Sequence, residues 1–332
     1  MNTSKPSFHS AHGALPYTLT NDYLFRAVFQ KNNTVLKGLI CSLLHLSEEQ
    51  VRSVTILNPI ELGKAIDSKT FILDIKVILN DAALINLEMQ VINHHFWPER
   101  SLSYLCRSFD SLNKGENYSA VKPVIHISFL DFTLFPVYPE FYSSYMLLNV
   151  KNNTIYSDKL KLTVVNLNQI ELATKEDKLY HIDYWAQLFK ATTWEEIKML
   201  AAKNQYIQEA SEALFELCAQ DDIREQCEAR EDYYRLERTL QSEHQFLVND
   251  LQHTRHTLAC MKDTLADTQN KLSNTQDKLS DTQDKLSDTQ DKLSDTQDKL
   301  SDTQDKLEYF KLENERLKAQ LQFFQNKEAV TP

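Results

Sequence analysis

Two neighbouring stretches of the sequence, separated by Asn80-Asp81-Ala82, combine apolar β-forming residues with polar ones. The pattern over residues 70–79 and 83–91 predicts two β-strands joined as a hairpin. Because successive side chains of a strand point to opposite faces, one face of this hairpin is expected to be apolar. The other face carries the residues best suited to chemistry, which are Asp74, Lys76, Asn86, Glu88 and Gln90.

The two acidic residues of this polar face are expected to meet across the hairpin. A turn centred on Asp81 places Leu79 opposite Ala83 and, in the same register, Asp74 opposite Glu88. Opposed Cβ atoms lie ~4.5–5.5 Å apart, where two carboxylates repel and their desolvation among apolar residues is costly. A divalent cation between them removes the conflict, and Mg²⁺ favours carboxylate oxygens together with water and phosphate.

The same hairpin also fits a simpler interpretation, in which its polar face is half-exposed and merely solvated. The register itself depends on the assumed turn centre, because a slip of one residue would move every side chain to the other face. Burial of the polar face and the strand register therefore decide between a site and an ordinary surface.

The flanking sequence predicts the elements that must position these residues. Thr20 is a good N-cap for a helix whose apolar spacing continues to Leu44, and Ser47 with Gln50 opens a short turn. A short strand is expected at 54–57, a buried strand at 124–130, and a helix at 97–112 between them. Pro98 suits the first turn of that helix and Gly115 its C-cap. The order β-β-β-α-β predicts an α/β domain with a mixed sheet.

The rest of the chain is expected to hold short strands, then helices. Residues 145–175 contain strand-like segments such as 161–167, and helices are predicted at about 180–190, 194–203 and 205–219. Thr193 with Glu196 is a capping box for the second of these helices. We divide the chain into a flexible leader at 1–16, a core at 17–175, a helical region at 176–250 and a heptad-repeat tail at 251–328.

The tail repeats a seven-residue unit close to DTQDKLS, so that a leucine recurs at every seventh position from Leu251 to Leu307. A sustained period of seven predicts a left-handed coiled coil and a homo-oligomer. If Leu occupies heptad position d, position a is Gln; if Leu occupies a, position d is Thr. With one good core residue per heptad, a loosely helical or disordered spacer is the alternative.

Four segments together resemble the recombination-promoting nuclease (putative transposase) branch of the PD-(D/E)XK nucleases. FILDIKV followed ten residues later by LEMQV resembles the core of that superfamily, with Gln90 where most members have Lys. The other three segments are TNDYLFRAVF (20–29), RSLSY (100–104) and KGENYSAVKPVIHISFLDF (114–132). The resemblance spans roughly 18–240 and implies a restriction-endonuclease-like core.

The resemblance also implies roles for particular residues. Asp74 and Glu88 would coordinate Mg²⁺ (or Mn²⁺), and Gln90 would position a water or a phosphate oxygen. Asp22 would complete the metal site or brace it, and Lys76 would supply the charge that Gln90 lacks. Two further residues, one helical turn apart, would contact the scissile phosphate or lock their helix over the site: Arg100 and Tyr104.

Composition limits the remaining possibilities. The net charge of −11 argues against a nucleic-acid partner, although the acidic tail contributes to it. Five cysteines without CxxC spacing read as reduced thiols, and four glycines nearly exclude a phosphate-cradling loop. No apolar run could span a bilayer and the N-terminus lacks a signal-peptide pattern, so a cytoplasmic protein without a membrane partner is expected.

Two interpretations therefore remain. The first is a Mg²⁺-dependent DNA endonuclease acting in recombination, transposition or defence, with RNA as the other substrate to test. The second is a catalytically weak or inactive nuclease-fold protein that acts as an oligomeric assembly module through its coiled coil.

Outside the hairpin, His94-His95 reads as a surface loop rather than metal ligands, and Tyr233-Tyr234-Arg235 as helix packing rather than base stacking.

Overall fold

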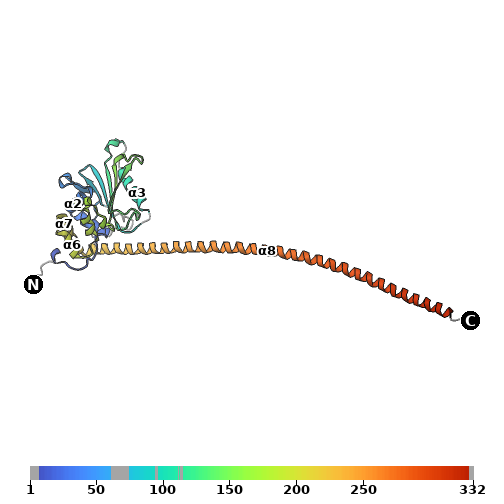
Figure 1. Cartoon of the computed structure of the whole chain (residues 1–332). Coiled ribbons are helices and arrows are strands. Elements are labelled where there is room, and N and C mark those ends of the chain that lie inside the picture. The colour runs from blue at the N-terminus through green and yellow to red at the C-terminus, as the bar shows by residue number, and fades with distance from the viewer. Residues whose placement is uncertain (1–6, 61–74, 94–95, 111, 113–114, 329–332) are drawn as a thin grey trace. The chain divides into compact units, whose positions relative to one another are not determined.

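The structure is a computed structural model that describes residues 7–60, 75–93, 96–110, 112 and 115–328, and side chains up to residue 323. The chain divides into two compact units, Met1–Glu243 and His244–Pro332 (Figure 1). The described helices include none long and apolar enough to cross a membrane.

A mixed six-stranded sheet forms the centre of the first unit, with the strand order β1-β2-β3-β4-β6-β5. Strands β3, β4 and β6 run parallel to one another, while β1, β2 and β5 pair antiparallel with their neighbours. The strand bounds are β1 Val54–Ile56, β2 Ile75–Leu79, β3 Ala83–Gln90, β4 Val124–Leu130, β5 Tyr142–Leu148 and β6 Ile155–Asn166.

The β2–β3 hairpin has the predicted register over the residues that the structure describes. Leu79 lies opposite Ala83 and Ile75 opposite Leu87. The turn between them holds Asn80 and Asp81 at φ of 53° and 55°, the left-handed backbone that Asn and Asp tolerate in tight hairpins. The Asn80 side chain also fastens the turn to residues 50–53, accepting from two backbone N–H groups and donating to the Gln50 carbonyl.

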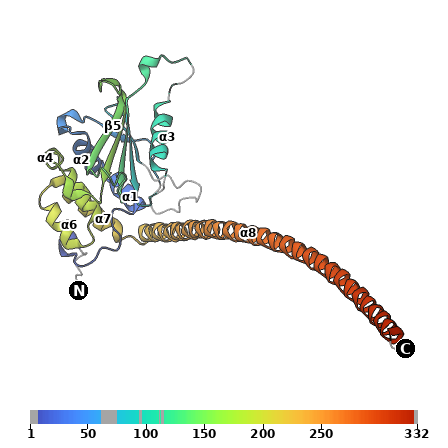
Figure 2. The same cartoon turned by 45° about the vertical axis from the view of Figure 1, so that its right-hand side comes forward.

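Helices pack on both faces of the sheet. Helix α3 (Trp97–Phe109) covers one face, while α1 and α2 lie on the other, as two views show (Figures 1 and 2). The remaining helices are α4 to α8. Helix bounds are α1 Asp22–Lys31, α2 Asn33–Leu44, α4 Lys175–Leu179, α5 Ile182–Lys190, α6 Trp194–Ala201, α7 Gln205–Cys218 and α8 Asp221–Glu328. Short 3₁₀ turns occur at Phe8–Ser10, Glu48–Gln50, Tyr118–Ala120 and Ile170–Leu172.

The two faces of the sheet have different interiors. The face toward α1, α2 and α5 holds the large core, where apolar residues of β2, β3 and β4 such as Val77, Leu87 and Phe129 are fully or almost fully buried. The face under α3 holds a smaller core that includes Trp97, Leu105 and Leu162. The polar residues of β3 lie on this second face, so α3 encloses them.

Several boundaries differ from the sequence-based expectations. The helix expected from Thr20 to Leu44 is two helices, with Asn21 capping α1 and Asn32 capping α2 by accepting from backbone N–H groups. Asp110, not Gly115, is the C-cap of α3. Residues 7–16, expected to be part of a flexible leader, pack on the helices: Phe8 is buried and the Leu15 N–H donates to the Thr192 carbonyl.

Other predictions are confirmed. The predicted strand 124–130 is β4, and α5, α6 and α7 match the three predicted helices to within two residues at each end. The capping box of Thr193 and Glu196 opens α6. All five cysteines are free thiols, and three of them, Cys41, Cys218 and Cys227, are buried.

Candidate nuclease site

Polar residues from adjacent parallel strands lie side by side beneath α3. The β3–β4 register aligns Asn86 with His126 and Glu88 with Ser128. All four are buried, with exposed fractions of 6% or less. Gln90, at the end of β3, is also buried. The interpretation of this face as a solvated surface is therefore wrong for β3, where the polar side chains are enclosed.

Glu88 is bound by the helix above it. Arg100 of α3 donates from Nη2 to Glu88 Oε1 at 3.0 Å. The Arg100 guanidinium lies 5.5 Å from the ring centroids of both Trp97 and Tyr104, its neighbours one turn away on the same helix face. Two aromatic rings thus restrict the orientation of the cation, which remains about a third exposed while Glu88 is buried.

His126 lies against the second oxygen of Glu88. Its Nε2 is 3.5 Å from Glu88 Oε2, and its Nδ1 is 3.0 Å from the amide nitrogen of Asn86. An amide nitrogen can only donate, so Nδ1 accepts and a neutral ring carries its proton on Nε2, toward the carboxylate. Burial, together with the nearby Arg100 guanidinium, lowers the pKa of His126 to about 4. The ring is therefore neutral at pH 7.

Three further polar atoms on this face are relevant to ligand binding. Within the described part of the chain, Asn86 Oδ1 and Ser128 Oγ are buried and make no hydrogen bond. Buried acceptors without a partner are uncommon and need an explanation, such as a bound water or ion. Gln90 uses its amide nitrogen to donate to the Ile92 carbonyl at 2.7 Å, which points the other amide atom, Oε1, elsewhere.

Asp22, at the start of α1, is held by the first turns of α8. Arg230 donates from Nε to Asp22 Oδ1 at 2.7 Å and from Nη2 to Oδ2, a two-pronged ion pair that is buried on both sides. The backbone N–H of Asp22 donates to the Tyr234 hydroxyl, and Arg230 lies over the rings of Tyr233 and Tyr234. The closest contacts of Asp22 therefore make it a brace between α1 and α8.

Of the remaining candidates, Lys76 is described by the structure, whereas Asp74 and His94-His95 are not. Lys76 is half-buried and lies directly opposite Asn86, on the same face as Glu88. Asp74 and His94-His95 lie outside the described residues. Among the residues that are described, no three His, Cys, Asp or Glu side chains come close enough to hold a metal ion. The proposed partner of Glu88, Asp74, was therefore outside this search.

The sequence interpretation missed two residues of the site and one of its supports. His126 and Ser128 alternate with apolar residues in a strand read only as buried, and that alternation was the available signal. Pairing each with a polar residue of β3 requires the β3–β4 register, which sequence does not give. Arg230 is 208 residues from Asp22 and had no local signal.

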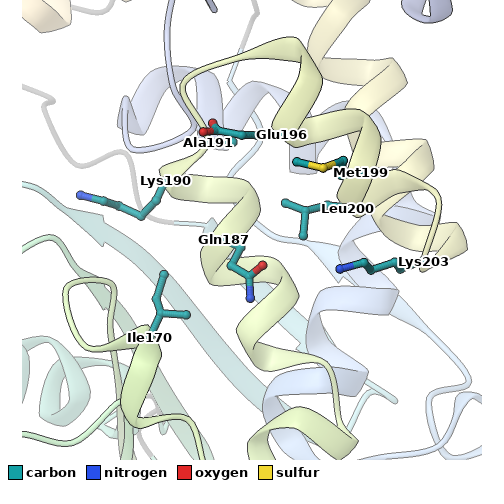
Figure 3. Close-up of a pocket in the computed structure, with 8 residues that line it drawn as sticks. All are labelled: Ile170, Gln187, Lys190, Ala191, Glu196, Met199, Leu200 and Lys203. Carbon is teal, nitrogen blue, oxygen red and sulfur yellow. The ribbon is translucent and has the colours of Figure 1, made fainter.

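A pocket of about 320 Å³ lies elsewhere, between α5 and α6 (Figure 3). Its charged groups already have partners: Lys190 binds Asp131 at 2.6 Å, and Glu196 caps α6. Lys203 lies over the ring of Tyr184. The pocket includes none of the candidate site residues, and these charges serve the packing of the helices.

Comparison with known proteins identifies the first unit. No curated protein and no solved structure matches the chain at the significance required. Residues 19–242 match the family described as PD-(D/E)XK nuclease family transposase. The match ends one residue before the boundary of the first unit and includes the α8 turns that hold Asp22. With two-thirds of its length matched and a mixed sheet of the expected kind, the chain belongs to the PD-(D/E)XK nuclease family transposases.

Proposed function

We propose that this protein is a metal-dependent endonuclease that hydrolyses phosphodiester bonds in DNA. The observation that carries the proposal is Glu88, a buried carboxylate in the middle of the sheet that contacts an arginine on a covering helix. Burying an ion is costly unless other groups compensate it. In a chain of a nuclease family, binding of a catalytic cation would explain why a carboxylate is kept at this buried position.

The residues present fit a divalent cation. Glu88 offers carboxylate oxygens, and the unsatisfied oxygens of Asn86 and Ser128 lie on the same face. Mg²⁺ keeps several waters when bound and needs only one or two protein carboxylates. Glu88 and Asp74 would hold Mg²⁺ or Mn²⁺, which would polarise the phosphate and lower the pKa of the attacking water.

The chain's own residues would orient the substrate. Arg100 combines partial exposure with a fixed orientation between two rings, so it can present N–H groups to a phosphate oxygen. Tyr104 lies beside it, and Gln90 Oε1 can accept from a water. Lys76, opposite Asn86, would add the positive charge that Lys provides at the position of Gln90 in other superfamily members. Asp22 would act indirectly, by fixing α1 to α8.

The test is plasmid cleavage by the purified full-length chain. We expect nicking or cutting with Mg²⁺ or Mn²⁺ and none with EDTA. Glu88→Gln and Asp74→Asn should each lower the rate by a factor of at least about 100, the effect of losing one charge-stabilising group in an active site. Thermal melting should show that both variants remain folded.

Matched control variants test whether losing any nearby carboxylate lowers the cleavage rate. Glu99 is an exposed glutamate on α3, one residue from Arg100, and Asp81 is an exposed aspartate in the hairpin turn, where Asn is equally tolerated. Glu99→Gln and Asp81→Asn should cut at the wild-type rate. Wild-type cutting by the folded Glu88→Gln variant would refute the site.

We also propose a second role, the assembly of several copies through the tail. The leucines of the repeat stay more than half exposed along α8, which is unusual for a helix without a partner. Deleting 251–332 should convert an oligomer to a monomer in sedimentation while leaving cutting intact. The same number of copies per particle with and without the tail would refute this role without affecting the nuclease.

A further inference from the structure

One apolar stripe runs along α8 in the second unit. Every leucine from Leu251 to Leu307, one per seven residues, is at least 53% exposed. A helix with such a stripe and polar residues elsewhere gains by covering it with another helix. What covers the stripe depends on the self-association of the tail proposed above.

The flanks of the repeat decide which heptad position the leucines occupy. If Leu were at d, position a outside the repeats would be basic in both flanks, at Arg255, Lys262, Lys311 and Lys318. If Leu is at a, position d outside the repeats is apolar at four places, each more than half exposed: Leu247, Met261, Phe310 and Leu317. The second assignment thus adds apolar residues at the other core position on both sides of the repeat, from Leu247 to Leu317.

This assignment places a threonine at d in each repeat, and the structure shows why that is tolerable. The hydroxyl of Thr289 donates to the Lys285 carbonyl, four residues earlier in the same helix, at 2.7 Å. The other repeat threonines do the same at 2.7–2.8 Å. Because the hydroxyl is satisfied within the helix, covering the threonine leaves no donor without a partner and its methyl group can pack.

We infer that α8 from Leu247 to Leu321 pairs in parallel and in register with the same segment of a second copy. The charges at the edges of the seam select this orientation. With Leu at a, position g of each repeat is Lys and position e is Gln. Parallel pairing places each Lys beside a Gln, whereas antiparallel pairing lines up the lysines of both chains and repels them. The lysines at g are Lys271, Lys278, Lys285, Lys292, Lys299 and Lys306.

The register comes from outside the repeats. Within them, a slip of seven residues changes almost no contact, because the units are nearly identical. Asn314 occupies an a position and finds a polar partner in parallel pairing when it faces another Asn314. A slip of one unit would place it against Leu307 or Leu321 and bury an unpaired amide, which is how a single Asn specifies register.

Disulfide cross-linking of the full-length chain tests orientation and register together. In a Cys106→Ser, Cys260→Ser background, which removes the two exposed thiols, single cysteines are placed at d as Thr268→Cys or Thr303→Cys. Oxidised glutathione should convert most of each variant to a covalent dimer. The control Asp305→Cys lies at f, on the outside of the pair, and should cross-link at least tenfold less.

Each other outcome overturns the inference. A covalent product only when Leu265→Cys and Thr303→Cys are mixed indicates antiparallel pairing. A product from mixed Thr268→Cys and Thr275→Cys, without dimers of either alone, indicates a slipped register. No cross-link together with a monomer mass in sedimentation excludes self-association. Plasmid cutting by the same samples is measured in parallel, so that failure of the nuclease proposal is seen separately.

Discussion

The buried ion pair between Asp22 and Arg230 is predicted to stabilise the first unit by joining α1 to the first turns of α8. Both side chains are at most 10% exposed, and the pair joins two elements separated by 208 residues. Arg230→Met keeps the aliphatic length of the side chain but leaves the Asp22 carboxylate buried without its cation. Removing one partner of a buried pair costs about 3–5 kcal/mol.

The size of the loss can be read from tryptophan fluorescence during urea unfolding. Trp97, Trp185 and Trp194 all lie in the first unit and are at most 7% exposed, so their emission reports that unit and not the helical tail. A loss of 3–5 kcal/mol would lower the melting temperature of a domain of this size by about 6–20 °C. Arg224→Met removes an exposed pair with Asp221 and should cost less than about 1 kcal/mol.

The double variant Asp22→Leu with Arg230→Met should recover much of the loss, because apolar replacement of both partners removes the buried charge. A loss below about 1 kcal/mol for Arg230→Met, or a double variant no better than the single one, would refute the role of the pair as a brace. Binding of Mn²⁺ gives an independent readout. A brace predicts unchanged affinity in folded Asp22→Asn, whereas a metal ligand predicts a large loss.

Three further predictions concern the first unit. His126 stays neutral in the fold to a pKa of about 4 but protonates near 6.5 when unfolded. The unfolded chain therefore binds more protons between these two pH values. The free energy of unfolding of the metal-free protein should fall by about 3 kcal/mol as the pH drops from 6.5 to 4, at ~1.4 kcal/mol per pKa unit. In urea titrations, His126→Gln should show a flatter dependence on pH in this range than wild type. Gly38→Ala should lower the melting temperature, since a Cβ there would lie 2.3 Å from the Tyr206 ring and overpacking costs about 1–3 kcal/mol; an unchanged melt would show that the α2–α7 contact can relax. Asn80→Ala should cost about 1–3 kcal/mol, because it removes the side-chain bonds to residues 50–53 at a residue with φ of 53°, while Asn80→Gly should recover only the backbone part.

The hairpin shows what sequence can predict for this chain. Alternation of apolar and polar residues, with Asn80-Asp81 between two strands, is a local signal, and the register between β2 and β3 follows from the turn. The same locality explains the confirmed capping boxes at Ser47 and Thr193. Glu88, Arg100 and Tyr104 were placed together by family resemblance, and in the structure Arg100 contacts both of the others.

What sequence missed depends on contacts between distant segments. The pairing of Asn86 with His126 follows from the parallel β3–β4 register, which the β3–α3–β4 crossover sets and no single turn encodes. The break at Asn32 was hidden because apolar spacing continues on both sides of it, while the asparagine side chain caps a new helix. The Asp74 position stays a prediction.

The repeat of α8 gives its tail an adjustable length. Seven residues add about 10 Å to a helix and return the leucine to nearly the same side, so whole units can be gained or lost without moving the apolar stripe. Under parallel pairing, two chains with different numbers of units could align the segment before the repeat or the segment after it, but not both. Chains with equal numbers of units would then pair in preference to chains with unequal numbers.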